Sequence, residues 1–419
     1  MDTIFAESTP PGRGGVSVVR LSGPKARSAV EELAGKIAAP RVAALRALRD
    51  GDDLIDRALV LWFEKDRSFT GEEVAELHVH GAPVILSRLT SALLARGLRR
   101  AEAGEFSRRA FLNGKMDLAE SEGLADLLSA ETEAQRKLAM KTADGELGRK
   151  VNLLRSRLVR AGALVEASID FADEEVPDEV PDEVFELVAE VRGSIADMLQ
   201  TYPATERLRQ GYEVAIVGPP NAGKSTLLNR IAQRDIALVS DIAGTTRDII
   251  ELRTDLRGLP VTFLDTAGIR DSIDPIEAMG VARATDRGRA ADLRIHLVDN
   301  DLPTFEVCDG DLVVRSKSDL RAGDGLRISA RTGEGVAELL DLVYDELRGR
   351  VADSGIVSHK RQAEALQRAQ NALNIVPGMP PEVIAEFLRQ AAVSLAEMIG
   401  QVGAEDYLDE IFSSFCIGK

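Results

Sequence analysis

The sequence is poor in cysteine and lacks any long apolar stretch. Only two cysteines occur in 419 residues, Cys308 and Cys416, and they lie far apart in the sequence. Two such thiols favour a reduced cytoplasmic protein over a disulfide-bonded secreted one. No apolar run reaches the roughly 18 residues of a membrane span, and the N-terminus lacks a basic segment followed by an apolar core. We therefore expect no membrane span, no signal peptide and a cytoplasmic location.

Positive charge is scarce relative to negative charge. The chain has 52 Lys and Arg residues against 69 Asp and Glu residues, which gives a net charge of −17. That balance argues against a free-standing nucleic-acid binder, which would carry a basic surface. With 44% hydrophobic residues the chain can still build packed cores, and its length predicts two or three domains.

A phosphate-binding motif stands at residues 218–225, with the sequence Gly-Pro-Pro-Asn-Ala-Gly-Lys-Ser. Its glycines let the backbone turn tightly, so that successive N–H groups can point at phosphate oxygens. Lys224 can reach the β- and γ-phosphates, and the Ser225 hydroxyl can ligate Mg²⁺. A short apolar run at 213–217 precedes the motif and a helical pattern at 225–231 follows it. A chance glycine turn is the alternative, and the motifs downstream argue against it.

Two of those motifs supply further groups near the phosphates. The stretch 244–248, Gly-Thr-Thr-Arg-Asp, offers Thr246 as a second Mg²⁺ ligand that senses the γ-phosphate. The stretch 265–268, Asp-Thr-Ala-Gly, follows an apolar run and places Asp265 near the metal. Ile269 comes next, where many GTPases carry the glutamine that orients the attacking water. Catalysis must therefore use another group or another cation.

Two more motifs are typical of a guanine site. Residues 316–319, Ser-Lys-Ser-Asp, place Asp319 where its carboxylate can accept two hydrogen bonds from a guanine edge, which adenine cannot supply. Residues 329–331, Ser-Ala-Arg, close the base pocket. Ser316 stands where Asn is usual. Because serine is shorter and has no amide, a hydrogen bond to the base and a tie to the phosphate loop can both be lost. The set resembles the translation-factor-like GTPases and predicts a GTP-binding domain.

The part of the chain before residue 118 has a different pattern. Residues 1–117 alternate strand-like runs, such as 16–21 and 58–63, with helical patterns near 25–36 and 82–96. This alternation predicts a compact α/β domain. It also contains three polar, glycine-rich stretches, and their composition alone predicts ordinary turns. These stretches are residues 9–15, 68–73 and 113–115.

Helical sequence brackets the GTP-binding domain on both sides. Residues 118–210 carry apolar residues three or four apart, and the helical pattern resumes over 351–419. Within 211–350 we predict a hairpin turn at 256–259 and, among the strands, one at 326–328. The predicted fold class is thus α/β and α, with an N-terminal α/β domain, a helical domain made of two segments, and a Ras-like P-loop domain inserted into it.

The whole chain resembles the MnmE (TrmE) family of tRNA modification GTPases. The resemblance lies in residues 10–16, 68–72, 104–106 and 111–115, in the inserted GTPase domain, and in the Cys-Ile-Gly-Lys tail at 416–419, which is very specific to that family. It implies that the N-terminal domain binds a tetrahydrofolate derivative and holds a homodimer together. It also implies a partner, the FAD-containing flavoprotein MnmG (GidA). The pair would add an aminomethyl or carboxymethylaminomethyl group to carbon 5 of the wobble uridine of certain tRNAs, with the methylene coming from the folate.

The resemblance assigns roles to individual residues. Glu277 would orient or deprotonate the attacking water. For Cys416 the sequence itself leaves two roles open: a thiolate that attacks an electrophilic methylene or holds a substrate carbon if nearby cations lower its pKa, or a cysteine that only packs. The folate contacts would be Arg20, Glu76, Lys115 and Lys419. K⁺ would replace an arginine finger and take oxygens from Asn221, Ser240, Ile242 and Thr245, while Ser225 and Thr246 hold Mg²⁺. The GTP-binding set comprises Asn221, Ala222, Gly223, Lys224, Ser225, Thr226, Ser240, Asp241, Ile242, Ala243, Gly244, Thr245, Thr246, Asp265, Thr266, Ala267, Gly268, Lys317, Asp319, Ser329, Ala330 and Arg331.

Two other functions remain open on the sequence. One is a ribosome-assembly switch that resembles the Era or Der GTPases, which often carry basic RNA-binding modules after the GTPase domain. The other is a folate-dependent methylene transferase in which GTP hydrolysis is vestigial. Folate binding would distinguish the tRNA-modification enzyme from the switch, and K⁺-stimulated hydrolysis would distinguish it from the vestigial GTPase.

Overall fold

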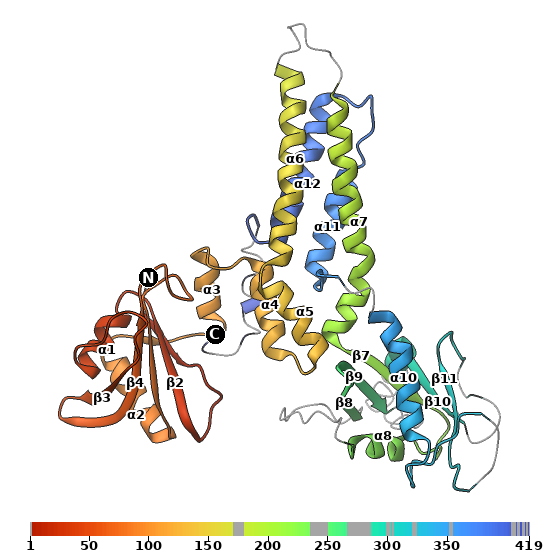
Figure 1. Ribbon diagram of the computed structural model, residues 1–419, viewed down its shortest axis with the longest axis horizontal. Helices are drawn as coiled ribbons and strands as arrows, with labels where there is room; N and C mark the ends of the chain where they lie inside the picture. The colour runs from red at the N-terminus through yellow and green to blue at the C-terminus, as the bar shows by residue number, and fades with distance from the viewer. Residues whose placement is uncertain are drawn as a thin grey trace, which may run out of the picture. The chain divides into compact units, whose positions relative to one another are not determined.

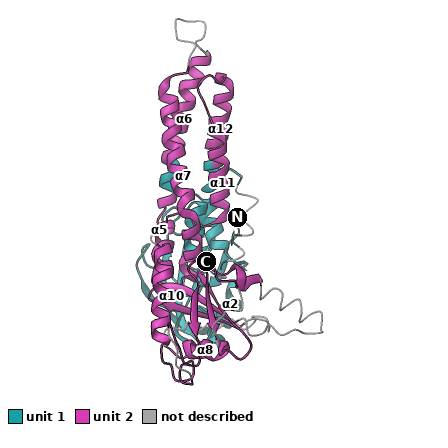
Figure 2. Ribbon diagram, turned by 90° about the vertical axis from the view of Figure 1, so that its right-hand side faces the viewer, with its two compact units in different colours: residues 1–125, 148–152, 395–419 teal, residues 126–147, 153–394 magenta. Residues whose placement is uncertain are grey.

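The computed structural model divides the chain into two compact units, which Figure 2 colours separately. The first unit comprises residues 1–125, 148–152 and 395–419, and the second comprises residues 126–147 and 153–394. The residues that the structure describes are 2–170, 180–234, 250–265, 286–298, 303, 306–320, 325–351, 355–403, 408, 411, 412, 415 and 418. No helix within these described residues is long and apolar enough to span a membrane.

The first unit is built on a six-stranded sheet with the order β3-β4-β5-β2-β1-β6. Its strands are β1 (Ile4–Glu7), β2 (Gly14–Ser22), β3 (Ala44–Asp50), β4 (Asp53–Phe63), β5 (Val74–Gly81) and β6 (Arg99–Arg100). Neighbours pair antiparallel, except that β1 and β6 are parallel. The helices α1 (Ala26–Ala34) and α2 (Pro83–Ala95) share one apolar core with the sheet, in which Leu33, Leu77 and Leu93 are fully or almost fully buried. The predicted α/β pattern of this part is confirmed.

Long helices form one part of the second unit. They include α5 (Glu133–Ala143), most of α6 (Glu146–Asp170), α7 (Asp182–Gln210), α11 (Lys360–Ala372) and most of α12 (Pro381–Met398). The two views agree that α6, α7, α11 and α12 lie side by side (Figures 1 and 2). On α7 the buried residues Val184, Val188, Val191 and Ile195 recur every three or four positions, which gives the helix one apolar face. The predicted helical character of these segments is confirmed.

A five-stranded sheet forms the other part of the second unit, in the order β11-β10-β7-β9-β8. Its strands are β7 (Tyr212–Val217), β8 (Ile250–Leu256), β9 (Leu259–Asp265), β10 (Leu293–Val298) and β11 (Leu312–Arg315). β8 alone is antiparallel, joined to β9 by a turn in which Arg257 and Gly258 have φ of 56° and 91°, as a type I′ hairpin requires. The predicted hairpin at 256–259 is confirmed. The helices α8 (Lys224–Ala232) and α10 (Val336–Val351) contribute to the core of this sheet (Figure 1).

The predicted strand at 326–328 is wrong in extent. Only Arg327 forms a bridge, to Arg315 at the end of β11. The amide of Arg315 donates to Leu326 O at 2.9 Å, and the amide of Ile328 donates to Arg315 O at 2.9 Å. The chain turns before this bridge, at Gly325, and again directly after it. The turns leave too few extended residues for a strand, although the predicted fold class as a whole is confirmed.

Candidate functional site

The nucleotide motifs come together because the sheet is parallel. β7 ends at Val217 and continues into the phosphate loop, β9 ends at Asp265, and β11 ends at Arg315 just before the base motif at 316–319. β7 pairs in parallel with β9 and β10, and β10 pairs in parallel with β11. Parallel strands place their carboxyl ends at one edge, where α/β proteins bind ligands. Motifs about 100 residues apart in sequence therefore line a single edge of this sheet.

The phosphate loop is tightly built around its glycines. Gly218 has a φ of 153°, and a Cβ there would lie only 2.4 Å from the carbonyl oxygen of Leu297 on β10. Gly223 has a φ of 100° and forms the N-cap of α8. Asn221 has a φ of 62°, and its side chain is exposed. The loop thus holds its left-handed residues directly before the positive end of the α8 dipole, a favourable place for phosphate.

Lys224 and Asp265 put opposite charges at this edge. The Lys224 side chain is buried, and its Nζ donates to Gly218 O at 2.9 Å and to Pro219 O at 3.0 Å. Burial lowers the pKa of Lys224, and the nearby Asp265 carboxylate opposes that shift. Asp265 is itself buried at the end of β9. Ser225 lies in the first turn of α8 and is half-buried.

The base motif is joined to the loop that follows residue 328. One carboxylate oxygen of Asp319, Oδ2, accepts hydrogen bonds from Arg331 Nε at 3.1 Å and from the Arg331 terminal nitrogen at 2.6 Å. The Ser329 side chain also hydrogen-bonds to Asp319, and these two partners lower the pKa of the carboxyl group. The amide of Ser318 donates to Ile328 O at 3.0 Å. Asp319 is therefore an ionised acceptor whose direction is set by residues 328–331.

That second loop, residues 329–334, is closed by its own hydrogen bonds. The amide of Ser329 donates to Glu334 O at 3.0 Å, and the amide of Gly333 donates to Ser329 O at 2.8 Å. Gly335 has a φ of 72°, and a Cβ there would lie 2.1 Å from the carbonyl oxygen of Arg327. Only glycine fits such a position. We call residues 329–334 the base loop.

The residues assigned to folate lie in the first unit. Arg20 on β2 and Glu76 on β5 stand opposite each other in register and form an ion pair at 3.0 Å. The Arg20 guanidinium carbon lies 5.9 Å from the centroid of the Phe69 ring and 6.0 Å from that of Phe106. Both distances are within the range of a cation–π contact. This arrangement sets a donor, an acceptor and aromatic rings beside one another.

Lys115 lies against the glycine-rich stretch 68–73. Its Nζ donates to Asp66 O at 2.7 Å, and the Asn113 side-chain amide donates to Thr70 O at 2.7 Å. A Cβ on Gly71, whose φ is 76°, would lie 3.0 Å from carbon atoms of both Asn113 and Lys115. Two of the three glycine-rich stretches, 68–73 and 113–115, therefore contact each other, although their composition alone predicts ordinary turns.

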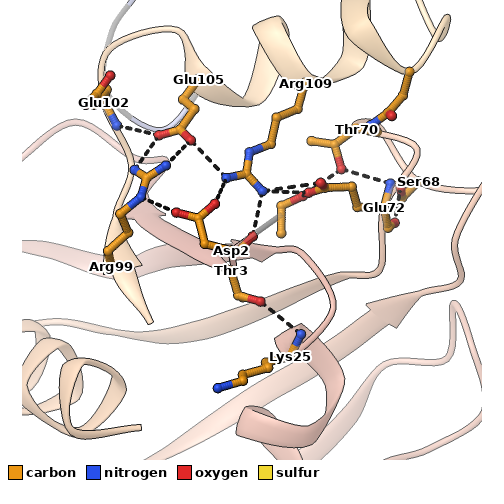
Figure 3. Close-up of polar contacts among 12 residues, drawn as sticks. Asp2, Thr3, Lys25, Ser68, Thr70, Glu72, Arg99, Glu102, Glu105 and Arg109 are labelled. Carbon is orange, nitrogen blue, oxygen red and sulfur yellow. Dashed lines mark hydrogen bonds and ion pairs between the residues drawn. The ribbon is translucent and has the colours of Figure 1, made fainter. Parts of the chain in front are cut away.

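A buried arginine holds the 68–73 stretch in place (Figure 3). Arg109 on α3 (Glu105–Leu112) pairs with Glu72 at 3.0 Å, with Asp2 at 2.7 Å and with Glu105 at 2.9 Å. Burial alone would lower the pKa of Arg109, but hydrogen bonds to Glu72 and Glu105 outweigh it and raise the pKa. Ser22 in turn donates to Glu72 at 2.7 Å. The network fixes the 68–73 stretch between β2 and α3.

Known proteins resemble this chain over its whole length. A family model described as the N-terminus of GTP-binding protein TrmE matches residues 3–115, and one described as the MnmE helical domain matches residues 118–416. The tRNA modification GTPase MnmE of Paracoccus denitrificans is 75% identical over 419 residues, and all of both chains is covered. That of Cereibacter sphaeroides is 50% identical over 431 residues, again with both chains covered in full. The chain belongs to the MnmE family of tRNA modification GTPases.

Solved structures overlap with this MnmE-family chain only in part. The structure of an Era variant from Aquifex aeolicus bound to GDP·AlF₄⁻ covers 40% of this chain and 69% of its own, with 22% identity and a TM-score of 0.24. A TM-score that low establishes nothing about a shared fold. Family membership therefore rests on the sequence matches.

Several residues assigned to the site lie outside the described residues. The structure places Asn221, Ala222, Gly223, Lys224, Ser225, Thr226, Asp265, Lys317, Asp319, Ser329, Ala330, Arg331, Arg20, Glu76 and Lys115. Those outside are Ser240, Asp241, Ile242, Ala243, Gly244, Thr245, Thr246, Thr266, Ala267, Gly268, Glu277, Cys416 and Lys419. Within the placed set, the structure joins Asp319 to Ser329 and Arg331, and Arg20 to Glu76.

Two residues that the sequence motifs do not include shape these sites in this MnmE-family chain. Arg109 supports the 68–73 stretch, and Arg230 on α8 bonds to the base loop. Neither is part of a motif, and their partners lie 37 and 100 residues away in sequence. No local sequence pattern predicts contacts between residues so far apart in the chain.

Proposed function

We propose that this chain hydrolyses GTP and, with the flavoprotein MnmG (GidA), adds a (carboxymethyl)aminomethyl group to carbon 5 of the wobble uridine of certain tRNAs. The one-carbon unit would come from a tetrahydrofolate derivative. The observation that carries the proposal is the placement of Lys224 and the Asp319 motif at the same edge of one parallel sheet. This arrangement supports GTP as the nucleotide, because a lysine for the phosphates and a carboxylate for the guanine edge occupy loops of the same edge.

The phosphate end of the site fits a magnesium ion. The Ser225 hydroxyl in the first turn of α8 and the Asp265 carboxylate at the end of β9 are oxygen donors of the kind that Mg²⁺ prefers. Thr246 would be the second protein ligand. Bound Mg²⁺ would neutralise charge on the β- and γ-phosphates. Lys224 would place its ammonium on the same phosphates, and the N–H groups of the loop would orient them.

Hydrolysis needs a substitute for the glutamine that Ile269 replaces. Asn221, exposed in the phosphate loop, offers a side-chain oxygen to K⁺, with further oxygens from Ser240, Ile242 and Thr245. A K⁺ ion held there would supply the positive charge that an arginine finger supplies elsewhere. Glu277 would orient or deprotonate the attacking water.

This assignment predicts that hydrolysis depends on the cation. At equal ionic strength we expect GTP hydrolysis to be about tenfold faster in K⁺ than in Na⁺, because the ion stabilises charge that develops in the transition state. Glu277→Ala should lower the rate about 10²-fold while GDP affinity stays the same. Asn221→Ala should remove the difference between the two salts. Equal rates of the unaltered protein in Na⁺ and K⁺ would show that Asn221 has no such role.

The first unit fits a folate. The pairing of Arg20 with Glu76 presents a carboxylate that can accept from a pterin edge, beside the aromatic rings of Phe69 and Phe106. Lys115, and Lys419 at the end of the tail, would bind the acidic glutamyl end. A bound folate would supply the one-carbon unit, while these residues orient it.

The C-terminal tail belongs to the same unit and would bring Cys416 to the substrates. Phe412 and Phe415 pack with Leu118, and the Phe412 ring centroid lies 6.4 Å from that of Phe111. Further along, Ser8 donates to Gly418 O at 3.2 Å. Phe412, Phe415 and Gly418 thus have defined contacts within the first unit, and Gly418 lies next to the end of β1. We propose a thiolate role for Cys416 on this basis.

The domain limits and assembly are part of the proposal. Residues 1–117 would form the folate-binding and dimerisation domain, 118–210 with 351–419 the helical domain, and 211–350 the GTPase domain. The chain would act as a homodimer, with MnmG and tRNA as partners.

Mass spectrometry of wobble uridines tests the proposed function. In cells that lack this protein we expect the (carboxymethyl)aminomethyl group to be absent, and to return when the full chain is supplied. Lys224→Ala should not restore it, because that chain cannot hold the phosphates. Modified uridines at normal levels in cells without the protein would refute the proposal.

A further inference from the structure

Ser316 does not connect the base motif to the phosphate loop. Its side-chain oxygen lies 3.4 Å from the carbonyl oxygen of Val298 on β10, and its amide donates to the same carbonyl at 3.0 Å. Both contacts are with the neighbouring strand. No hydrogen bond joins Ser316 to the described residues of the phosphate loop, 218–225. A second route between the phosphate side and the base motif starts on α8.

Arg230 makes that connection from the helix that follows the phosphate loop. It lies in the last turn of α8, six residues after Lys224. Its Nε donates to Ala330 O at 3.0 Å, and a terminal nitrogen donates to Arg331 O. The planar guanidinium can serve two successive carbonyls with its fork of donors. A Cβ on Gly333 would lie 3.8–3.9 Å from the Arg230 guanidinium, so the base loop packs on this side chain.

The bonds continue from Arg230 to the carboxylate that faces the base. The base loop is closed by its own hydrogen bonds, so fixing Ala330 and Arg331 fixes the loop as a whole. Ser329 and Arg331 from this loop both hydrogen-bond to Asp319. A continuous path therefore runs from the phosphate-loop helix through Arg230 to Asp319.

We propose that Arg230 is a positioning residue for guanine recognition, which fixes the base loop on α8 and makes the tie that Ser316 does not make. The inference rests on the proposed function in one respect, namely that Asp319 binds the guanine edge. It goes further in assigning base selectivity to a residue of the phosphate-loop helix that lies outside the sequence motifs and bonds to the base loop.

The test compares affinities for GDP and IDP, which lacks the 2-amino group of guanine. In the full-length chain, Arg230→Met keeps an apolar stem and removes both hydrogen bonds. We expect the Kd for GDP to rise about tenfold, because a base loop that is no longer held on α8 must be ordered when guanine binds. The Kd for IDP should rise less, so that the preference for GDP over IDP falls. Ser316→Asn in the same chain should restore both quantities, because the asparagine rebuilds a tie to the phosphate loop.

The controls separate positioning from folding. Arg234→Met removes a cation one turn further on, whose side chain makes no hydrogen bond or ion pair with the described residues, and should leave both Kd values unchanged. If Arg230→Met does not fold, Arg230→Lys keeps one donor and should give an intermediate GDP preference. An unchanged preference in the variant, or a loss that Ser316→Asn does not reverse, would overturn the inference. If the unaltered chain binds no GDP, the proposed function fails instead.

Discussion

Asp319→Asn should convert the nucleotide preference from GTP to xanthosine triphosphate. In the proposed site the carboxylate would accept from two donors of guanine, and an amide would face one of them with a donor of its own. Xanthine carries a carbonyl in place of that amino group and suits the amide. Because one charge-assisted hydrogen bond is replaced by a donor that faces a donor, and the other becomes a neutral hydrogen bond, the Kd for GTP should rise about 10³-fold. Isothermal titration with GTP, xanthosine triphosphate and ATP measures the change.

Binding of xanthosine triphosphate by the same variant is the internal control, since it shows that the phosphate loop is intact. Arg331 donates to the Asp319 carboxylate, and its side chain is largely exposed. Loss of this ion pair should therefore lower the stability of the fold only slightly. Equal binding of ATP and GTP by the unaltered chain would contradict the role of Asp319.

Gly104→Ala should abolish uridine modification while GTP hydrolysis persists. Gly104 has a φ of 64°, and a Cβ there would lie only 2.2 Å from the carbonyl oxygen of Phe412. The backbone at Phe412 must move to relieve this contact, and in the proposed mechanism such a movement would carry the thiol four residues later away from its substrate. The modified uridine in complemented cells should fall more than about tenfold, and the K⁺-dependent hydrolysis rate of the purified chain should not change.

A matched glycine provides a control that distinguishes backbone strain at the substituted residue from displacement of the tail. Gly51 also has a φ of 64°, but a Cβ there would meet no atom within 4 Å. Gly51→Ala thus carries the same left-handed penalty, about 1–2 kcal/mol, without the clash. It should support normal modification. Cys416→Ser leaves the tail in place and removes only the sulfur, so it should fail in the same assay. Normal modification by Gly104→Ala would show that the tail position does not matter, and normal modification by Cys416→Ser would leave the thiol without a role.

The local chemistry of the nucleotide site was predictable from the sequence. A phosphate loop requires glycines at positions such as Gly218 and Gly223, because only they adopt its left-handed turns at no steric cost. The strand before it and the helix after it were predictable because apolar residues recur with the period of a strand or of a helix. The predicted strand at 326–328 failed because three residues between turns carry too little periodicity to show that the chain leaves the sheet after one bridge.

The partners of these local elements were decided by the tertiary structure. Arg230 bonds to carbonyls 100 and 101 residues away, and Arg109 pairs with Glu72 across 37 residues. A backbone carbonyl has no sequence signature, so the contact of Arg230 appears only once α8 and the base loop lie side by side. By itself the sequence determined most of the helices and strands and the order of the phosphate-loop and base motifs along the chain, because these depend on residue type and short-range spacing. Only the fold decided which distant side chains hold those segments in position, because that depends on how the sheets and helices pack.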